Sequence, residues 1–265
     1  MPTEISPLTG AIGAEVRGVD LKRPLDGVTF DTLHRAFLAH CVLVFRDQHI
    51  DENAQLGFAR HWGEPYETPL LKYVPGFPAL LRLTNPTKEY TSTETWHYDA
   101  PHAAVPPKIT VLSARVIPLG GDTMWCNQYL AYERLSPGMQ RMLAGVRARF
   151  RATRLARYLR ADADDVPSAV HPVIRTHPET GRKALYIGHP ENVPHFEDMT
   201  VEESRPLVEY LYQHSQAPDT TYRHMWRKGD VLMWDNRCTM HYAVHDYGTQ
   251  ERELDRVTLR GEVPA

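Results

Sequence analysis

Short apolar segments separated by turn residues follow one another along the chain after residue 95, and they restrict the folds open to it. Segments of this length, bounded by proline or glycine, predict β-strands. The 21 prolines and 13 tyrosines of the 265-residue chain also favour many short strands over a helical bundle. The expected strands span residues 41–45, 80–83, 109–117, 147–153, 184–188, 230–234 and 252–259, with a short strand pair at 9–20.

Helical patterns begin in the N-terminal part of the chain. Apolar residues recur there at helical spacing, and Asp51 is an expected N-cap. A later helix has Ser136 as cap and Pro137 in its first turn. The predicted helices span residues 29–40, 51–62, 136–144 and 200–213. Helices first and strands afterwards predict a mainly β barrel or sandwich with flanking helices packed outside.

The composition excludes several classes of partner. A net charge of −3, from 30 basic and 33 acidic residues, provides no positive field for nucleic acid or an anionic membrane. No apolar run approaches the length of a membrane span, and the first ten residues lack the pattern of a signal peptide. We therefore expect a cytoplasmic protein with three reduced cysteines, folded as a single domain over 1–265.

Residues 66–95 differ from their surroundings in being rich in proline, threonine and charge. Long connections of this kind in compact domains are commonly functional. We predict that they form a flexible loop that covers bound substrate.

Candidate metal ligands stand in two places. His97 and Asp99 lie two residues apart, and on a strand such side chains leave the same face. His241 follows the expected strand at 230–234. Neither place alone indicates a metal site, because the chain has 14 histidines. The alternative for His97 and Asp99 is a pair of side chains on the protein surface. Together, two histidines and one carboxylate with open coordination positions predict the facial triad of a non-haem iron(II) oxygenase.

Two arginines follow the last of these histidines. Arg252 comes after a turn and is expected on the antiparallel strand beside that of His241, where it can pair bidentately with a carboxylate. Arg256 lies four residues further along and faces the same way. Two guanidiniums that point into one barrel need two anions as partners, and a 2-oxoacid and an anionic substrate would supply them. The alternative for Arg256 is a surface ion pair with Glu253 or Asp255.

Taken together, these motifs resemble those of the taurine dioxygenase and 2,4-dichlorophenoxyacetate dioxygenase family of iron(II)/2-oxoglutarate enzymes. The resemblance covers nearly the whole chain. It rests on residues 13–20 (GAEVRGVD), 46–48 (RDQ), 96–99 (WHYD), 120–123 (GGDT), 171–178 (HPVIRTHP) and 234–236 (WDN), with His241, Arg252 and Arg256.

This resemblance implies a double-stranded β-helix, or cupin-like jelly-roll, core and a single catalytic domain that uses Fe(II), 2-oxoglutarate and O2. By the family pattern, His97, Asp99 and His241 bind the iron. Thr123 and Arg252 hold the far carboxylate of 2-oxoglutarate, and Arg256 meets the acidic group of the substrate. For Thr123, turn chemistry after two glycines is the alternative. Relatives are often dimers or tetramers, so we expect a homo-oligomer.

Departures from the family pattern bear on the substrate. Thr68 and Leu71 align where taurine dioxygenases have a sulfonate-binding histidine and a tyrosine, which makes taurine itself doubtful. Lys72 is a candidate partner for a carboxylate, as in aryloxypropionate-type members, or a solvated loop lysine. Tyr98 completes the candidate substrate residues. We expect hydroxylation, and possibly cleavage, of a small anionic carboxylate or sulfonate that is aryloxyalkanoate- or taurine-like.

Two other functions stay open. The same chemistry on an amino acid or a biosynthetic intermediate is suggested by Gly188 and His189, where many relatives have an asparagine. A zinc hydrolase or a non-catalytic jelly-roll binding protein is the alternative from another class, since a fold proves no activity. Neither of these last two explains Arg252 together with Thr123.

Overall fold

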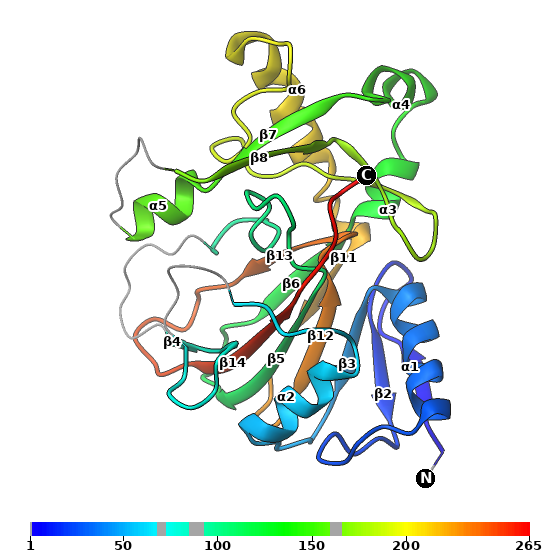
Figure 1. The fold of residues 1–265 in the computed structure, drawn as a ribbon, viewed down its shortest axis with the longest axis vertical. Helices are drawn as coiled ribbons and strands as arrows, with labels where there is room; N and C mark the ends of the chain where they lie inside the picture. The colour runs from blue at the N-terminus through cyan, green and yellow to red at the C-terminus, as the bar shows by residue number, and fades with distance from the viewer. Residues whose placement is uncertain (1, 68–72, 85–92, 160–165) are drawn as a thin grey trace.

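Strands make up most of the regular structure in the computed structural model of the chain, which describes residues 2–67, 73–84, 93–159 and 166–265 (Figure 1). The helices are α1 (Gly27–His40), α2 (Glu52–Arg60), α3 (Gln128–Glu133), α4 (Pro137–Leu143), α5 (Thr153–Leu159) and α6 (Val201–His214). The strands are β1 (Glu4–Pro7), β2 (Ala14–Arg17), β3 (Val42–Phe45), β4 (Leu80–Thr84), β5 (Ile109–Val116), β6 (Thr123–Asn127), β7 (Arg147–Arg151), β8 (Ser168–Pro172), β9 (Ile174–Thr176), β10 (Lys183–Leu185), β11 (Thr221–His224), β12 (Val231–Asp235), β13 (Thr239–Ala243) and β14 (Glu253–Leu259).

Two sheets carry the elements around the candidate ligands. The larger has seven strands in the order β1-β2-β3-β12-β5-β14-β4, and all its pairs are antiparallel except β2 with β3. The smaller has three antiparallel strands in the order β11-β6-β13. Strands β7 and β8 form a separate pair, as do β9 and β10. An isolated bridge joins His97 to His241 and so attaches the WHYD segment to β13.

Helices α1 and α2 cover one face of the seven-stranded sheet (Figure 1). Phe37 of α1 and Phe58 of α2 share a buried cluster with Phe45 of β3, Met233 of β12 and Val257 of β14. Because side chains alternate along a strand, the residues between them face the other way.

The opposite face of this sheet packs toward the three-stranded sheet. Val44 and Leu232 lie there in a second cluster with Trp125 of β6 and Tyr222 of β11. In a third cluster, Cys126 of β6 and Met240 of β13 pack with residues of β7, β10, α4 and α6. The chain is therefore mainly β. Helices α1 and α2 cover one face of the larger sheet, and the three-stranded sheet packs against its other face.

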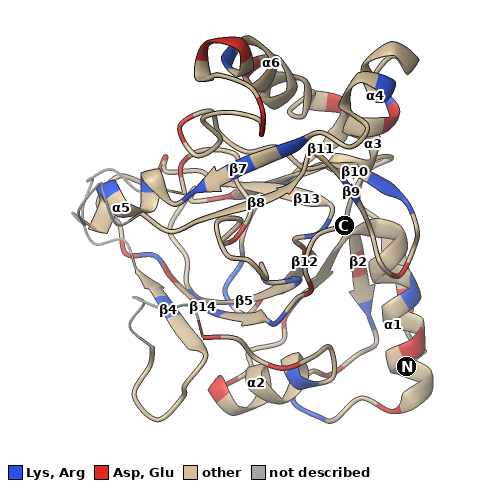
Figure 2. Cartoon of the chain, turned by 45° about the horizontal axis from the view of Figure 1, so that its top comes forward, with Lys and Arg blue, Asp and Glu red and all other residues tan. Residues whose placement is uncertain are grey.

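The predicted helices are confirmed, and side-chain caps explain where they begin. Asp51 accepts a hydrogen bond from the Ala54 amide at the start of α2. Thr200 and Glu203 form a reciprocal capping box at α6, which continues through Pro206. Figure 2 shows acidic and basic residues interspersed over the elements, as the small net charge suggests. No helix in the described ranges is both long and apolar enough to cross a membrane.

Several strand predictions were wrong in extent or missing. The segment 147–153 is a strand only to Arg151, and Thr153 begins α5. The pair expected at 9–20 was misplaced: only β2 lies in this range, and its partner β1 lies before it at Glu4–Pro7. No strand was predicted at β6, β11 or β13, so the whole three-stranded sheet was missed. Of the expected loop at 66–95, residues 68–72 and 85–92 lie outside the described residues, and β4 lies within it.

Candidate active site

A cavity opens between the two sheets, and strands of both line it. Leu112 of β5, Trp234 of β12 and Leu254 of β14 contribute from the larger sheet, and Thr123 and Ala243 from the smaller one. The side chains of His97, Asp99 and His241 also line this cavity. All three candidate ligands are thus accessible from one space.

These three side chains form the group best suited to hold a metal among the described residues. Each offers one ligand atom, and the three atoms lie within 4.8 Å of one another. His241 Nε2 lies 3.8 Å from Asp99 Oδ1. The ring centroids of the two histidines are 4.1 Å apart. The group contains no fourth His, Cys, Asp or Glu from the described ranges, unlike a closed structural zinc site.

His97 and Asp99 meet there for a different reason from the one the sequence suggested. The segment 96–99 is not a strand; only His97 is bridged, through the reciprocal 2.9 Å hydrogen bonds between its backbone and that of His241. The His97 Nδ1 atom contacts the Thr95 carbonyl oxygen at 2.6 Å, which makes it the protonated nitrogen. The Nε2 atom of His97 is then the one free to bind a metal.

The protonation states of the three groups suit a cation. Burial lowers the pKa of His97, and it lowers that of His241 further below the ordinary value. Burial alone would raise the pKa of Asp99, but Arg256 and the two imidazoles outweigh it and bring this pKa to about 2. At neutral pH the cluster therefore presents one carboxylate and two neutral imidazoles, the forms that coordinate metals.

Arg252 lines the cavity with no anionic partner among the described side chains. No acidic side chain in the described ranges forms an ion pair with it, and burial lowers its pKa. Its Nε donates to the Gly121 carbonyl oxygen at 2.9 Å. Gly121 has φ +70°, and a Cβ there would stand 2.9 Å from Arg252 Cδ and Nε, so glycine makes room for the guanidinium. This is the environment of a cation held ready for a ligand.

Arg252 does not lie beside the strand of His241, contrary to the prediction. Arg252 directly precedes β14, which pairs with β4 and β5 in the larger sheet, whereas β13, which carries His241, pairs with β6 in the smaller sheet. Both arginines nevertheless reach the same cavity, as does Thr123 of β6. The Thr123 hydroxyl accepts a 2.9 Å hydrogen bond from Trp226 Nε1, so its own proton remains available to donate.

Arg256 is not part of a surface ion pair. Its Nη1 lies 3.3 Å from Asp99 Oδ1, and its side chain lines the cavity. Its two acidic neighbours in sequence pair elsewhere: Asp255 contacts Arg82 and Arg115, and Glu253 contacts Arg82.

The remaining candidate substrate residues are placed unevenly. Tyr98 lines the cavity but is 2% exposed, and its hydroxyl donates to the Leu185 carbonyl oxygen at 2.8 Å. Its phenol is therefore engaged in the core. Thr68, Leu71 and Lys72 lie outside the described residues.

Sequence reasoning missed several cavity residues. Glu94 and His245 line the cavity and contact each other at 2.8 Å, so a carboxylate besides Asp99 does face it. Leu155 and Tyr158 come from α5, a helix that was not predicted. None of these stands in a motif, and only the folded arrangement brings them to the cavity.

Comparison with known proteins supplies independent findings. The family model of "Taurine catabolism dioxygenase TauD, TfdA family" matches residues 4–258. The chain is 36% identical to an alpha-ketoglutarate-dependent sulfate ester dioxygenase of Pseudomonas putida, over 98% of this chain and 90% of the relative. It is 31% identical to the alpha-ketoglutarate-dependent 2,4-dichlorophenoxyacetate dioxygenase of Cupriavidus pinatubonensis, over 97% and 98%.

Among solved structures, that of AAD-2 in complex with Mn(II) and N-oxalylglycine is similar, with a TM-score of 0.87 and 28% identity. The match covers 100% of this chain and 99% of that one. The likeness therefore extends over the whole of both chains.

Proposed function

The chain belongs to the taurine catabolism dioxygenase TauD, TfdA family, and from this membership we propose that it is an iron(II)- and 2-oxoglutarate-dependent dioxygenase of a small organic anion. The resemblance stated from the motifs is thereby confirmed. The observation that carries the proposal is the cluster of His97, Asp99 and His241 in one cavity with Arg252, which has no ion-pair partner among the described residues. We propose further that residues 1–265 form a single catalytic domain with a jelly-roll core, built from the two facing sheets. A cytoplasmic homo-oligomer, dimer or tetramer, stays a prediction.

The donor set fits iron(II). His97 Nε2, His241 Nε2 and Asp99 Oδ1 would hold the ion and leave positions for further ligands, as in the facial triad. The pKa shifts of these groups leave Asp99 ionised and both imidazoles neutral at neutral pH, as metal binding requires. When bound, iron(II) and 2-oxoglutarate supply the means to activate dioxygen, with conversion of the 2-oxoacid to succinate and carbon dioxide.

Arg252 and Thr123 would hold the carboxylate of 2-oxoglutarate that is distant from the metal. A guanidinium that no described side chain pairs with and a hydroxyl with a free proton offer this carboxylate charge-assisted and neutral hydrogen bonds. N-oxalylglycine, present with Mn(II) in the AAD-2 structure, is a 2-oxoglutarate analogue. That complex supports the proposal that this fold binds a metal and a 2-oxoacid together.

The substrate end of the cavity suits an anion with an apolar body. Arg256 supplies positive charge beside Asp99, while Leu81, Leu83 and Leu155 line other parts of the cavity. Apolar lining holds a hydrocarbon or aromatic group by burial and excludes water from the reacting carbon. Sulfate esters and aryloxyalkanoates, the substrates named for two relatives, have this form. Taurine, with a two-carbon body and an ammonium group, fits such walls less well.

Anaerobic absorption spectroscopy tests the proposal. Metal-free protein is mixed with Fe(II) and 2-oxoglutarate, and the visible charge-transfer band of a chelated 2-oxoacid is expected in the parent. It should be weaker in Arg252→Ala and absent in His97→Ala. A folded parent protein without the band contradicts the proposal.

Substrate class is then tested aerobically. Succinate formation is measured with a medium-chain alkyl sulfate, an aryloxyalkanoate and taurine at equal concentrations. We expect one of the first two to exceed taurine, and a preference for taurine would overturn the substrate assignment.

A further inference from the structure

A chain of buried hydrogen bonds ends on the oxygen of Asp99 that faces away from His241. Thr110 Oγ1 of β5 lies 2.6 Å from Asp99 Oδ2, and Asn236 Nδ2 lies 2.9 Å from Thr110 Oγ1. Trp234 Nε1 lies 2.9 Å from Asn236 Oδ1. Thr110 is 0% exposed, and Asn236 and Trp234 are 2% and 1% exposed. Water therefore does not compete for these groups.

We propose that Thr110 is a positioning residue that keeps Asp99 Oδ2 away from the metal, and that Asn236 and Trp234 fix the direction of its proton. The inference rests on the proposed function, because it concerns how the carboxylate would bind iron(II). It assigns a role to two motif residues, Trp234 and Asn236, and to a strand residue outside every motif.

The chemistry of the donors determines the direction of the chain. An indole N–H can only donate, so the atom of Asn236 that meets Trp234 is its carbonyl oxygen. The amide nitrogen of Asn236 must then face Thr110, whose oxygen accepts from it. The proton of Thr110 is left to donate to Asp99, which as a carboxylate can only accept. Each hydrogen bond thus determines which atom is the donor in the next one.

This direction separates the two oxygens of Asp99. Oδ2 receives the Thr110 hydroxyl and lies 3.4 Å from Asn236 Nδ2, whereas Oδ1 faces His241 Nε2 and Arg256. A carboxylate held in this way binds a cation through Oδ1 alone. Bidentate binding would occupy an extra coordination position, and a chelating 2-oxoacid together with dioxygen needs all the positions that three ligands leave open.

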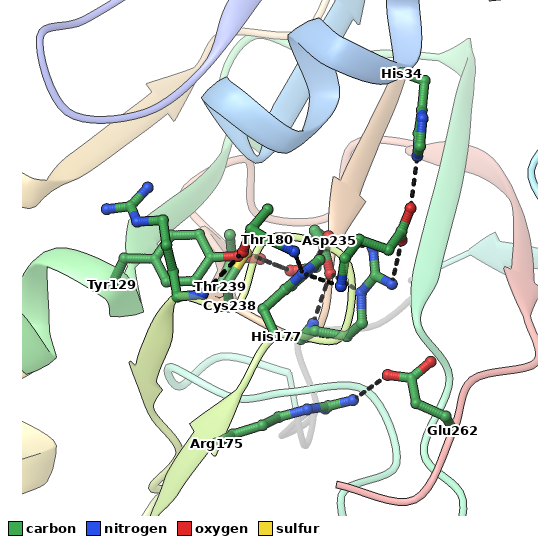
Figure 3. A network of polar contacts seen from close by, with 12 residues as sticks. His34, Tyr129, Arg175, His177, Thr180, Asp235, Cys238, Thr239 and Glu262 are labelled. Atoms are coloured by element: carbon green, nitrogen blue, oxygen red, sulfur yellow. Dashed lines mark hydrogen bonds and ion pairs between the residues drawn. The ribbon is translucent and has the colours of Figure 1, made fainter. Parts of the chain in front are cut away.

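The turn that carries Asn236 is itself firmly held (Figure 3). Asp235 accepts from Arg237 Nε at 2.8 Å and Nη2 at 2.7 Å, and it contacts His177 Nε2 at 3.0 Å. Arg237 also pairs with Glu179, which contacts His34 of α1. A side chain on such a turn has little freedom, which suits a residue that must hold its amide in one orientation.

The same chain touches the third ligand. The Trp234 ring lies against His241, with centroids 4.7 Å apart. The Trp234 indole therefore packs on the imidazole of His241. Through its N–H bond to Asn236, it also makes Thr110 the donor in the hydrogen bond to Asp99. Positioning contacts of this kind around metal ligands commonly change metal affinity by about 10- to 100-fold when removed.

The test compares Thr110→Val, which removes the hydroxyl at nearly constant shape, with Thr110→Ser, which keeps it. Thr258→Val is the matched control, because Thr258 lies opposite Thr110 on β14 and donates to the Tyr66 carbonyl oxygen instead. Calorimetry gives the Kd of each protein for Co(II), an oxygen-stable substitute for iron(II). It then gives the Kd for 2-oxoglutarate at saturating Co(II).

We expect Thr110→Val to weaken Co(II) binding about 10- to 100-fold, and Thr110→Ser and Thr258→Val to stay within about threefold of the parent. In cobalt-loaded Thr110→Val, Asp99 Oδ2 keeps only the longer 3.4 Å contact with Asn236 Nδ2, so it should compete with 2-oxoglutarate for the metal and weaken its binding. Parental affinity for both ligands in folded Thr110→Val overturns the inference alone. An equal loss in Thr110→Ser also overturns it, because packing rather than the hydroxyl would then be responsible. A parent that binds no metal overturns the proposed function, and this inference with it.

Discussion

Charged residues on β14, together with Arg252 directly before it, lie in opposite conditions on the two sides of this strand. On the side away from the cavity, Asp255 is 0% exposed and both its oxygens are paired, Oδ1 with Arg82 at 2.8 Å and Oδ2 with Arg115 at 2.6 Å. On the cavity side, Arg252 has no ion-pair partner in the described ranges, and Arg256 reaches only Asp99. A fully paired buried charge holds the fold, whereas one left unpaired is available to a ligand.

Replacement of a candidate ligand on the cavity side should have the largest effect. In His97→Ala, succinate formation is expected to fall below about 1% of the parent rate, because the metal loses one of three ligands. The melting temperature should stay near that of the metal-free parent. A parental rate in His97→Ala would show that His97 is not a metal ligand, and the functional role assigned to the cavity side would then be wrong.

Asp255→Ala should do the opposite. The change leaves Arg82 and Arg115 without their buried partner, so the free energy of unfolding should fall by about 3–5 kcal/mol. Urea denaturation measures this fall, and calorimetry of the remaining folded protein should give the parental Kd for Co(II). A stable variant with weakened metal binding would show that the two faces are not separate in role.

Arg252→Ala should act on co-substrate binding and little on stability. Loss of charge-assisted hydrogen bonds of about 2–3 kcal/mol predicts a rise in the KM for 2-oxoglutarate of about 30- to 150-fold. The melting temperature should hold or rise, because the change removes a buried cation that has no anionic partner in the described parts of the chain. A drop comparable to that of Asp255→Ala would mean that Arg252 supports the fold.

The smallest effect is expected away from both faces. Thr200→Ala removes the capping box of α6, and the free energy of unfolding should fall by about 1 kcal/mol with kcat and KM unchanged. Urea denaturation and steady-state kinetics check the two parts. A change in KM would reveal coupling between α6 and the cavity.

Features that depend on neighbouring residues were readable from the sequence. Asp51 and Ser136 cap their helices as predicted, since a cap needs only a side chain and amides two or three residues away. The motif residues also pointed to the site chemistry, because His, Asp and Arg side chains limit what a cluster can bind. The pattern of these residues sufficed to identify the family without any knowledge of which strands pair.

Pairing between distant strands was decided only by the tertiary structure. The strand β13 has no alternating pattern and exists because it pairs with β6, more than a hundred residues earlier in the chain. His97 meets His241 through a single bridge, not through a strand of its own. Thr110 carries no motif at all and becomes important only because β5 places it beside Asp99. Local sequence determines propensities and chemistry, but contacts between remote segments depend on how both sheets pack at once, and that information resides in no single segment.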